Sequence, residues 1–280
     1  MHRILTGGLR VDRLTFPMAG LSDRLVGSII VQLSDFHYGE GRLSDRLLER
    51  AIITSNRLNP DLVVLTGDYV THDPTSIDVL VSHLKHLQSR AGVYAILGNH
   101  DLGYRRRYYR DRIIEALQRG GIEVLWNRVA YPWGPDLALV GLAEWKSGAF
   151  SPRSVLDGID PDIPRIVLSH NPDTAAFMKN WRIDLQLSGH THGGQVCLPG
   201  FGSISRLVKP LRRRIPDRFH RYIPYLSKCS RVVHHWEWAS GLHRVGNNWL
   251  YVNRGLGTHP PGRFFCPPEV TEIKLGVGNG

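Results

Sequence analysis

Residues 29–39, Ile-Ile-Val-Gln-Leu-Ser-Asp-Phe-His-Tyr-Gly, open as an apolar, largely β-branched run and then turn polar. The run 29–34 predicts a buried strand. Asp35 and His37 follow it, and because side chains alternate along an extended chain, these two point the same way. They are either a turn aspartate with a surface histidine, or the beginning of a polar site at a strand end.

The same arrangement recurs one helix later. Residues 44–58 predict an amphipathic helix that Ser44 can cap, and the buried strand 62–66 behind it runs into Gly67-Asp68. Two strands around one helix form a βαβ unit, which brings both carboxylates to one edge of the sheet. That edge is where α/β proteins place their sites.

Three further predicted strands, 93–97, 165–169 and 183–187, also end in polar residues. The last delivers Ser-Gly-His-Thr-His-Gly-Gly-Gln at 188–195, where glycines let the backbone approach closely. Chance explains one such ending but not several in phase. In chain order, the polar residues at the five strand ends are Asp35 and His37, Asp68, Asn99 and His100, His170, and His190 with His192.

The remaining periodic segments predict the elements around this edge. We expect an edge strand at 8–18 ended by Pro17, helices at 76–90, 105–119 and 173–180, consecutive antiparallel strands at 122–126, 128–131 and 137–142, and late strands at 250–253 and 269–275. The six arginines of 105–119 form either a solvated face or a wall for an anionic group.

Composition indicates one globular domain over residues 1–280, with 42% hydrophobic and 21% charged residues. The net charge of +10 favours anionic partners, or simply solubility. Three cysteines without a CxxC pair argue against a disulfide framework or zinc ribbon and for a reducing, cytoplasmic setting. No apolar run approaches the length of a transmembrane helix, and the start lacks the apolar core of a signal peptide.

Residues from about 200 to 246 differ from the rest, because basic and aromatic residues alternate there without a regular period. Such a segment is a passive insert, a lid, a surface for an anionic membrane, or a binding strip for single-stranded nucleic acid. Its basic residues are Arg206, Lys209, Arg212, Arg213, Arg214, Arg218 and Arg221, and its aromatics are Phe201, Phe219, Tyr222, Tyr225, Trp236 and Trp238.

The strand-end residues supply seven oxygen and nitrogen donors and no thiolate. Such a set suits Mn²⁺ above all, with Fe or Zn²⁺ as alternatives, better than Mg²⁺ or Ca²⁺. Seven donors are too many for one tetrahedral ion but fit two ions sharing a carboxylate, about 3.5–4 Å apart, which can form a hydroxide and hold a phosphoryl oxygen. His100 is the candidate acid for the leaving oxygen.

Together, Asp35-x-His37, Gly67-Asp68, Gly98-Asn99-His100-Asp101, His170 and Gly189-His190-Thr191-His192 resemble the signature of the calcineurin-like metallophosphoesterase superfamily. The resemblance implies an α/β fold, a four-layer αββα sandwich of two mixed sheets flanked by helices. It implies one metal held by Asp35, His37 and His192, a second held by Asn99, His170 and His190, Asp68 between them, and His100 as the acid or a phosphate partner.

The tail 251–258, with Arg263-Phe264 and Pro267-Pro268-Glu269, is similar to a bacterial branch of membrane-associated phosphodiesterases and UDP-2,3-diacylglucosamine pyrophosphatases. One departure stands out: the protein phosphatases of the superfamily carry Asp-Arg where this chain has Thr71 and His72. Protein phosphatase activity is therefore disfavoured, and the group that orients His100 stays open. Without an apolar anchor, membrane contact would be peripheral, at the inner face.

Two classes of function follow. The first is a dinuclear phosphodiesterase or pyrophosphatase acting on a lipid-linked or UDP-sugar substrate, with a soluble cyclic-nucleotide or nucleic-acid diester as the alternative. The second is a non-catalytic metal-binding scaffold, which missing ligands would favour; none of the seven is missing. No protein partner is indicated.

Overall fold

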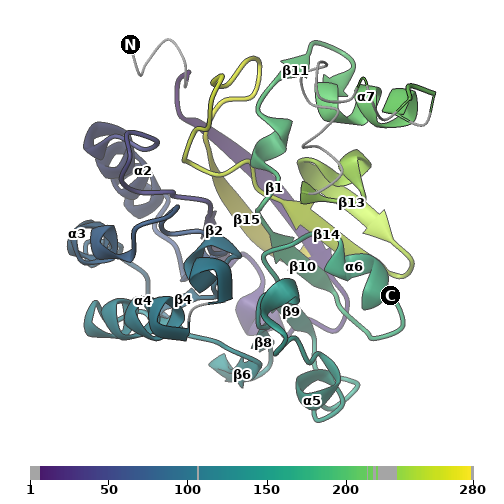
Figure 1. Ribbon diagram of the computed structural model, residues 1–280. Helices are drawn as coiled ribbons and strands as arrows, with labels where there is room; N and C mark the ends of the chain where they lie inside the picture. The colour runs from purple at the N-terminus through teal and green to yellow at the C-terminus, as the bar shows by residue number, and fades with distance from the viewer. Residues whose placement is uncertain (1–6, 106, 213, 217–218, 220–231, 279–280) are drawn as a thin grey trace.

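The computed structural model describes residues 7–278 apart from 106, 213, 217–218 and 220–231. Two six-stranded sheets lie face to face, and helices cover their outer faces (Figure 1). The predicted four-layer αββα sandwich is therefore confirmed.

The first sheet has the order β1-β15-β2-β3-β4-β5. Strands β2 to β5 run parallel, β15 runs antiparallel to β2, and β1 pairs in parallel with β15 at the edge. The bounds are β1 Arg10–Met18, β2 Ile29–Leu33, β3 Leu62–Leu65, β4 Val93–Ala95, β5 Glu123–Val124 and β15 Glu269–Val277.

The second sheet has the order β13-β14-β10-β9-β8-β6, with a parallel centre and antiparallel outer strands β13 and β6. The bounds are β6 Arg128–Ala130, β8 Ala138–Gly141, β9 Arg165–Leu168, β10 Leu185–Ser188, β13 Gly241–Val245 and β14 Asn248–Val252. Outside both sheets lie β7 Pro132–Pro135 and a small hairpin of β11 Cys197–Leu198 with β12 Gly202–Ser203.

Alternation along the strands builds separate cores. In β3, Leu62 and Val64 face the second sheet, where they pack in one cluster with Ile166 and Leu187. Their neighbours along the strand point to the opposite face and pack under helices. Burial of both faces explains why these strands read as continuous apolar runs.

The outer layers are helical. Helices α2 Asp45–Arg57, α3 Ile77–Leu84 and α4 Arg107–Arg119 cover the first sheet, while α5 Arg153–Leu156 and α6 Thr174–Phe177 cover the second. The Ser44 side chain accepts from the Leu47 backbone N–H, so the predicted cap of α2 is present.

Two predicted boundaries were wrong. Strand β1 continues through Pro17 to Met18, which the sheet tolerates because β1 is an edge strand. Helix α3 ends at Leu84 rather than 90. The Asn56 side chain bonds the His86 carbonyl at 2.8 Å and the Gln88 N–H at 2.9 Å, which holds this stretch in a turn against α2.

The expected run of three consecutive antiparallel strands was wrong for its first strand only, because β6 and β8 do pair antiparallel. Strand β5 belongs to the first sheet, parallel to β4, whereas β6 pairs with β8 in the second sheet. The chain crosses between sheets at 125–127, where Leu125 enters the core between them. The predicted helix 173–180 is a single turn, α6.

The segment predicted as an insert, about 200–246, contains helix α7 Ile204–Arg212. Its predicted end is too late, because β13 at Gly241–Val245 is part of the second sheet. The predicted basic and aromatic residues Arg213, Arg218, Arg221, Tyr222 and Tyr225 lie outside the described residues. Within the described part of the chain, no helix is long and apolar enough to cross a bilayer.

Candidate active site

Five parallel strands from both sheets point their carboxyl ends at one region, and all eight predicted site residues meet there. Strands β2, β3 and β4 deliver Asp35 with His37, Asp68, and Asn99 with His100; β9 and β10 deliver His170, and His190 with His192. Side-chain contacts and a shared cavity join them.

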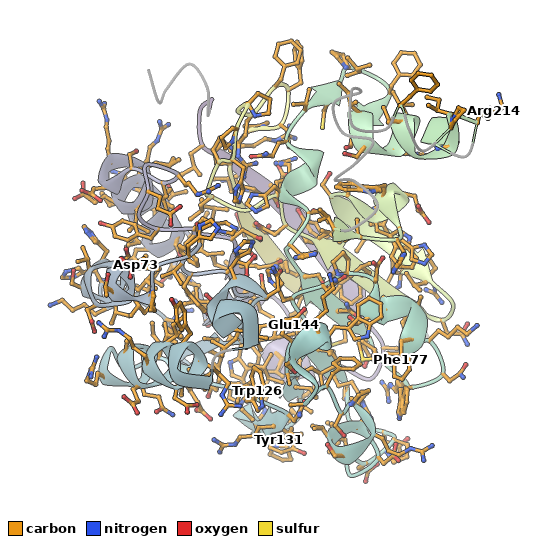
Figure 2. All side chains as sticks on the ribbon, viewed as in Figure 1. Asp73, Trp126, Tyr131, Glu144, Phe177 and Arg214 are labelled. Carbon is orange, nitrogen blue, oxygen red and sulfur yellow. The ribbon has the colours of Figure 1, made fainter. Side chains whose placement is uncertain are left out.

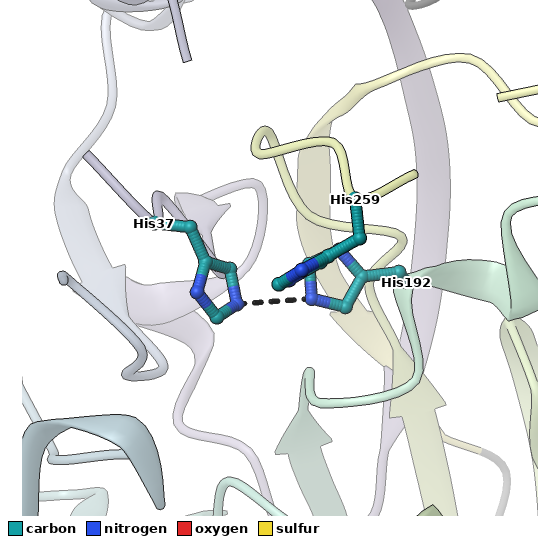
Figure 3. Close-up of side chains that lie close together, drawn as sticks. All are labelled: His37, His192 and His259. Atoms are coloured by element: carbon teal, nitrogen blue, oxygen red, sulfur yellow. Dashed lines mark hydrogen bonds between the residues drawn. The ribbon is translucent and has the colours of Figure 1, made fainter. Parts of the chain in front are cut away.

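One half of the site gathers around two histidines. His37 Nε2 lies 3.0 Å from His192 Nε2 (Figure 3). It also lies 3.5 Å from Asp68 Oδ2. His192 Nε2 is 3.4 Å from Asp35 Oδ1. These four side chains therefore aim their donor atoms at one point.

The other half gathers on the far side of Asp68. His170 Nε2 lies 3.1 Å from Asp68 Oδ2 and 3.2 Å from His190 Nδ1. Asn99 Oδ1 is buried and has no hydrogen-bond partner among the described residues. An unpaired buried amide oxygen costs free energy that a cation would remove, so this half fits a metal ion.

Backbone carbonyls fix the imidazole rings. His170 Nδ1 donates to the Thr66 carbonyl at 2.7 Å, His192 Nδ1 to the Gly257 carbonyl at 3.2 Å, and His190 Nε2 to the Val232 carbonyl at 3.0 Å. A carbonyl oxygen only accepts, so whenever one of these rings is neutral its opposite nitrogen turns a lone pair to the site. Outer hydrogen bonds of this kind orient metal-binding histidines.

The backbone is strained at five of the predicted ligands. Left-handed φ angles occur at Asp35 (50°), His37 (44°), Asp68 (55°), His190 (71°) and His192 (51°). Non-glycine residues rarely adopt this conformation, and it persists only where the surroundings impose it, typically at functional sites.

Two glycines make room for the carboxylates. A Cβ at Gly189 would lie 2.2 Å from Asp35 Oδ2, and one at Gly98 would lie 2.1 Å from Asp68 Oδ1. Any side chain at either position would therefore displace a predicted ligand.

Burial sets the charge of most histidines. Burial lowers the pKa of His37 and His192 well below the usual range, and burial with the nearby charge of His170 lowers that of His190 to about 3. These rings are neutral at pH 7, which is the form that binds metal.

His170 is the exception. Burial alone would lower its pKa, but the charge and hydrogen bond of Asp68 outweigh burial and raise the pKa of His170 to about 10. Burial would favour protonated Asp68, yet His170 and His100 hold the Asp68 pKa well below its usual range. A proton on His170 therefore supplies the positive charge beside Asp68.

The group that orients His100 is the backbone carbonyl of Thr71. His100 Nδ1 donates to it at 3.1 Å, and the His100 backbone N–H donates to Asp68 Oδ1 at 2.9 Å. The residue that replaces the aspartate of protein phosphatases thus orients the histidine through its main chain.

His259 is a site residue that the sequence analysis missed. Its ring centre lies 4.4 Å from that of His37 and 4.7 Å from that of His192 (Figure 3). Arg42 donates to His259 Nδ1, so the hydrogen of the neutral ring is on Nε2, as in a donor rather than a ligand. His259 lies on the loop after β14, well beyond the strand's end at Val252, so the rule that polar residues directly follow a strand did not find it.

Asp101 is a second missed residue. Its buried carboxylate accepts from the backbone N–H groups of Asp68, Tyr69 and Gly98, each at 2.8 Å. Burial, reinforced by the charge of Asp68, raises the pKa of Asp101 to about 8. It ties the end of β3 to the end of β4 and so sets the position of Asp68.

A cavity of about 630 Å³ opens onto the donors. It adjoins a second cavity of about 980 Å³ and shares Asn99, His100 and Lys146 with it. The second cavity is walled by Leu102, Glu144 and Trp145 (Glu144 is labelled in Figure 2). The two together can accept a substrate larger than a phosphate group.

The predicted anionic wall on 105–119 is not supported by its described arginines. Arg112 and Arg119 pair with Asp78 at 2.7 and 2.8 Å, and Arg110 pairs with Asp111. These three form a solvated, ion-paired face; Arg106 lies outside the described residues, and the side chains of Arg105 and Arg107 are not described either.

Comparisons with known proteins agree with this site. The family profile described as calcineurin-like phosphoesterase matches residues 29–194, which include all eight predicted residues. A dimetal phosphatase from Danio rerio superimposes with a TM-score of 0.50 at 12% identity, covering 84% of this chain and 90% of that one. At this identity the likeness shows the fold.

Three curated relatives are similar over almost the whole chain. The uncharacterized metallophosphoesterase YkuE of Bacillus subtilis is 32% identical, covering 90% of this chain and 80% of its own. The phosphodiesterase YaeI of Escherichia coli is 31% identical, covering 92% and 86%. The UDP-2,3-diacylglucosamine pyrophosphatase LpxG of Chlamydia muridarum is 26% identical, covering 94% and 88%. The chain therefore belongs to the calcineurin-like phosphoesterases and is a phosphoester hydrolase of that metal-dependent family.

Proposed function

We propose that this chain hydrolyses phosphodiester or pyrophosphate bonds with two metal ions that share Asp68. The observation that carries the proposal is the position of Asp68 Oδ2, 3.5 Å from His37 Nε2 and 3.1 Å from His170 Nε2. One carboxylate oxygen thus faces both groups of donors, the arrangement that a bridging ligand needs.

In this proposal Asp35, His37 and His192 hold one ion, and Asn99, His170 and His190 hold the other. Mn²⁺ is the metal we propose, with Fe or Zn²⁺ as the alternatives that such oxygen and nitrogen donors also accept. When bound, the ions supply an activated water and neutralise charge on the phosphoryl oxygens.

His100 serves as the acid. Hydrolysis breaks a P–O bond, and the leaving oxygen needs a proton unless it is a very stable anion. The Thr71 carbonyl occupies Nδ1 of His100, so Nε2 is the ring nitrogen that meets a substrate in the cavity.

His259 positions the phosphoryl group. Its Nδ1 accepts from Arg42, and burial with the Arg42 charge lowers its pKa to about 4, so Nε2 carries the only ring hydrogen at pH 7. A neutral N–H donor beside His37 and His192 can bind a phosphoryl oxygen without competing for a metal.

We propose a lipid-linked UDP-sugar pyrophosphate as the substrate, bound with peripheral contact to an anionic membrane. The activity for which LpxG is named, the size of the two adjoining cavities and the basic-aromatic segment support this choice. A soluble diester is the second candidate, because YaeI is named a phosphodiesterase.

The test is a substrate panel on protein reconstituted with Mn²⁺: bis(p-nitrophenyl) phosphate, p-nitrophenyl phosphate and UDP-2,3-diacylglucosamine in mixed micelles. We expect turnover of the diester and the pyrophosphate and little of the monoester. Turnover of the diester but not of the pyrophosphate would select the soluble substrate. Turnover of neither, with two metals bound, would contradict the proposal.

A further inference from the structure

Exposed apolar side chains gather at one end of the molecule. Leu198 and Phe201 lie on the β11–β12 hairpin with 39% and 67% of their surface exposed, and Phe264 and Phe265 lie on the 253–268 loop with 55% and 64% exposed. We call these four residues the aromatic rim. Hairpin and loop lie side by side, since Val196 bridges Phe264 (Figure 1).

Hydrogen bonds hold the backbone that carries the rim. The Phe264 N–H donates to the Gln195 carbonyl at 2.8 Å, and the Cys197 N–H donates to the Phe264 carbonyl at 2.9 Å. The buried Arg263 guanidinium donates to the carbonyls of Arg254 at 2.8 Å and Gly257 at 2.6 Å. The rings are therefore exposed by a well-bonded backbone rather than by a loose loop.

Phe265 is held in a strained conformation. Its φ of 50° is in the left-handed region, which bulky residues avoid, and it keeps two consecutive rings exposed where an extended chain would point them to opposite sides. Strained backbone of this kind is found mainly at functional sites, so the exposure of this apolar ring suggests a binding role.

The net positive charge of the chain is concentrated in residues 196–266, which include the rim. Residues 196–266 contain 12 Lys and Arg but only 2 Asp and Glu, whereas the other 209 residues contain 23 of each. The whole net charge of +10 thus comes from this quarter of the sequence. Arg206 and Arg214 on its described part are exposed (Arg214 is labelled in Figure 2).

We infer that the aromatic rim docks the protein on an anionic lipid bilayer. Exposed aromatic rings in a segment that also carries an excess of cationic side chains suit insertion at the boundary of headgroups and acyl chains. A protein partner would instead need a groove or flat apolar face of several hundred Å².

The rim lies next to the site. Gln195, just before the hairpin, and His259 and Pro260 of the 253–268 loop line the 630 Å³ cavity. Docking therefore brings the cavity to the bilayer surface, where a lipid-linked phosphate would be presented. Docking itself does not depend on hydrolysis, but its use for a lipidic substrate rests on the proposed function.

The experiment is co-sedimentation with extruded vesicles of phosphatidylcholine alone, or with 30 mol% phosphatidylglycerol, for the full chain and for the double variant Phe264→Ser/Phe265→Ser. Phe177→Ser is the matched control, because Phe177 on α6 is 56% exposed but lies outside the rim and the basic segment. Turnover of soluble bis(p-nitrophenyl) phosphate, measured alongside, reports on the proposed function separately.

We expect binding to anionic vesicles that weakens as salt is raised. The partition coefficient should fall about 10- to 100-fold in the double variant, as the loss of two partly inserted rings requires. Phe177→Ser should bind like the parent protein. Absence of binding to anionic vesicles, equal binding by the double variant, or an equal loss with Phe177→Ser would overturn the inference, whatever the turnover.

Discussion

The two halves of the candidate site are built from similar residues but carry different charge. In the half around His37 and His192, burial keeps both rings neutral. In the half around His170 and His190, Asp68 holds a proton on His170 and raises its pKa to about 10. A cation entering the first half meets lone pairs, whereas one entering the second must first displace a proton.

If two ions bind as proposed, this difference predicts that metal loading is ordered and that Asp68 controls the order. Asp68 contacts both halves and is itself positioned by Asp101 and by the His100 backbone N–H. A site in which one carboxylate serves two groups of donors should fail as a unit when that carboxylate is neutralised.

The largest effect is expected from Asp68→Asn. The amide keeps the shape but loses the charge that two cations share, so kcat/KM should fall at least ~1,000-fold, beyond the 10- to 100-fold typical of outer groups. Steady-state kinetics with elemental analysis measures both losses. The matched Asp162→Asn change, on an exposed loop, should alter neither. Retention of two ions and of activity by Asp68→Asn would contradict the proposal that the two ions share the Asp68 carboxylate.

Substitution of His100 should separate acid catalysis from metal binding. In His100→Asn we expect two bound ions and a loss of about 100- to 1,000-fold for substrates with alkyl or phosphate leaving groups. For p-nitrophenyl esters the loss should be much smaller, because p-nitrophenolate leaves without a proton. An equal loss for both kinds of leaving group would contradict the role of an acid.

His259→Ala tests whether the extra histidine of the first half is a donor or a ligand. As a donor to the phosphoryl group, its loss should lower kcat/KM about 10- to 100-fold while both ions remain bound, a cost typical of one lost hydrogen bond to a charged group. Elemental analysis decides between the roles. Loss of one ion per chain would make His259 a ligand instead.

The smallest effect is on metal affinity as pH changes. Because the His170 proton is present at pH 7 and is lost only near pH 10, binding in the second half should release one proton and strengthen about tenfold per pH unit from 7 to 9. The first half should show little change, since its histidines are already neutral. Calorimetric Mn²⁺ titrations at several pH values, in buffers of different ionisation enthalpy, measure the protons released and the slope of metal affinity against pH for each half. Equal slopes for the two halves would contradict the proposed difference between them.

Much of this site was predictable from the sequence because parallel strands obey a simple geometry. Each buried apolar run marks a strand, and the polar residues after it must lie at the same sheet edge, which brings Asp35 next to His192 although 157 positions separate them. The four-layer fold follows from the same runs, since a strand apolar on both faces needs cover on both sides.

The rest depends on tertiary contacts that local pattern does not encode. His259 reaches the site through a loop whose course is set by the buried Arg263 and its carbonyl partners. The Thr71 carbonyl that orients His100 is a backbone group, which no residue pattern reveals. Strand β5 pairs with β4 in the first sheet rather than with β6. Short strands of similar composition can pair in either sheet, and packing in the core decides which.

The central claim, that two metal ions share Asp68, is tested most directly by titrating Mn²⁺ into metal-free protein while recording electron paramagnetic resonance. We predict two ions per chain, the second producing the spectrum of an exchange-coupled pair, and no coupled spectrum in Asp68→Asn. A single ion per chain, or two ions that remain magnetically independent, would contradict the claim.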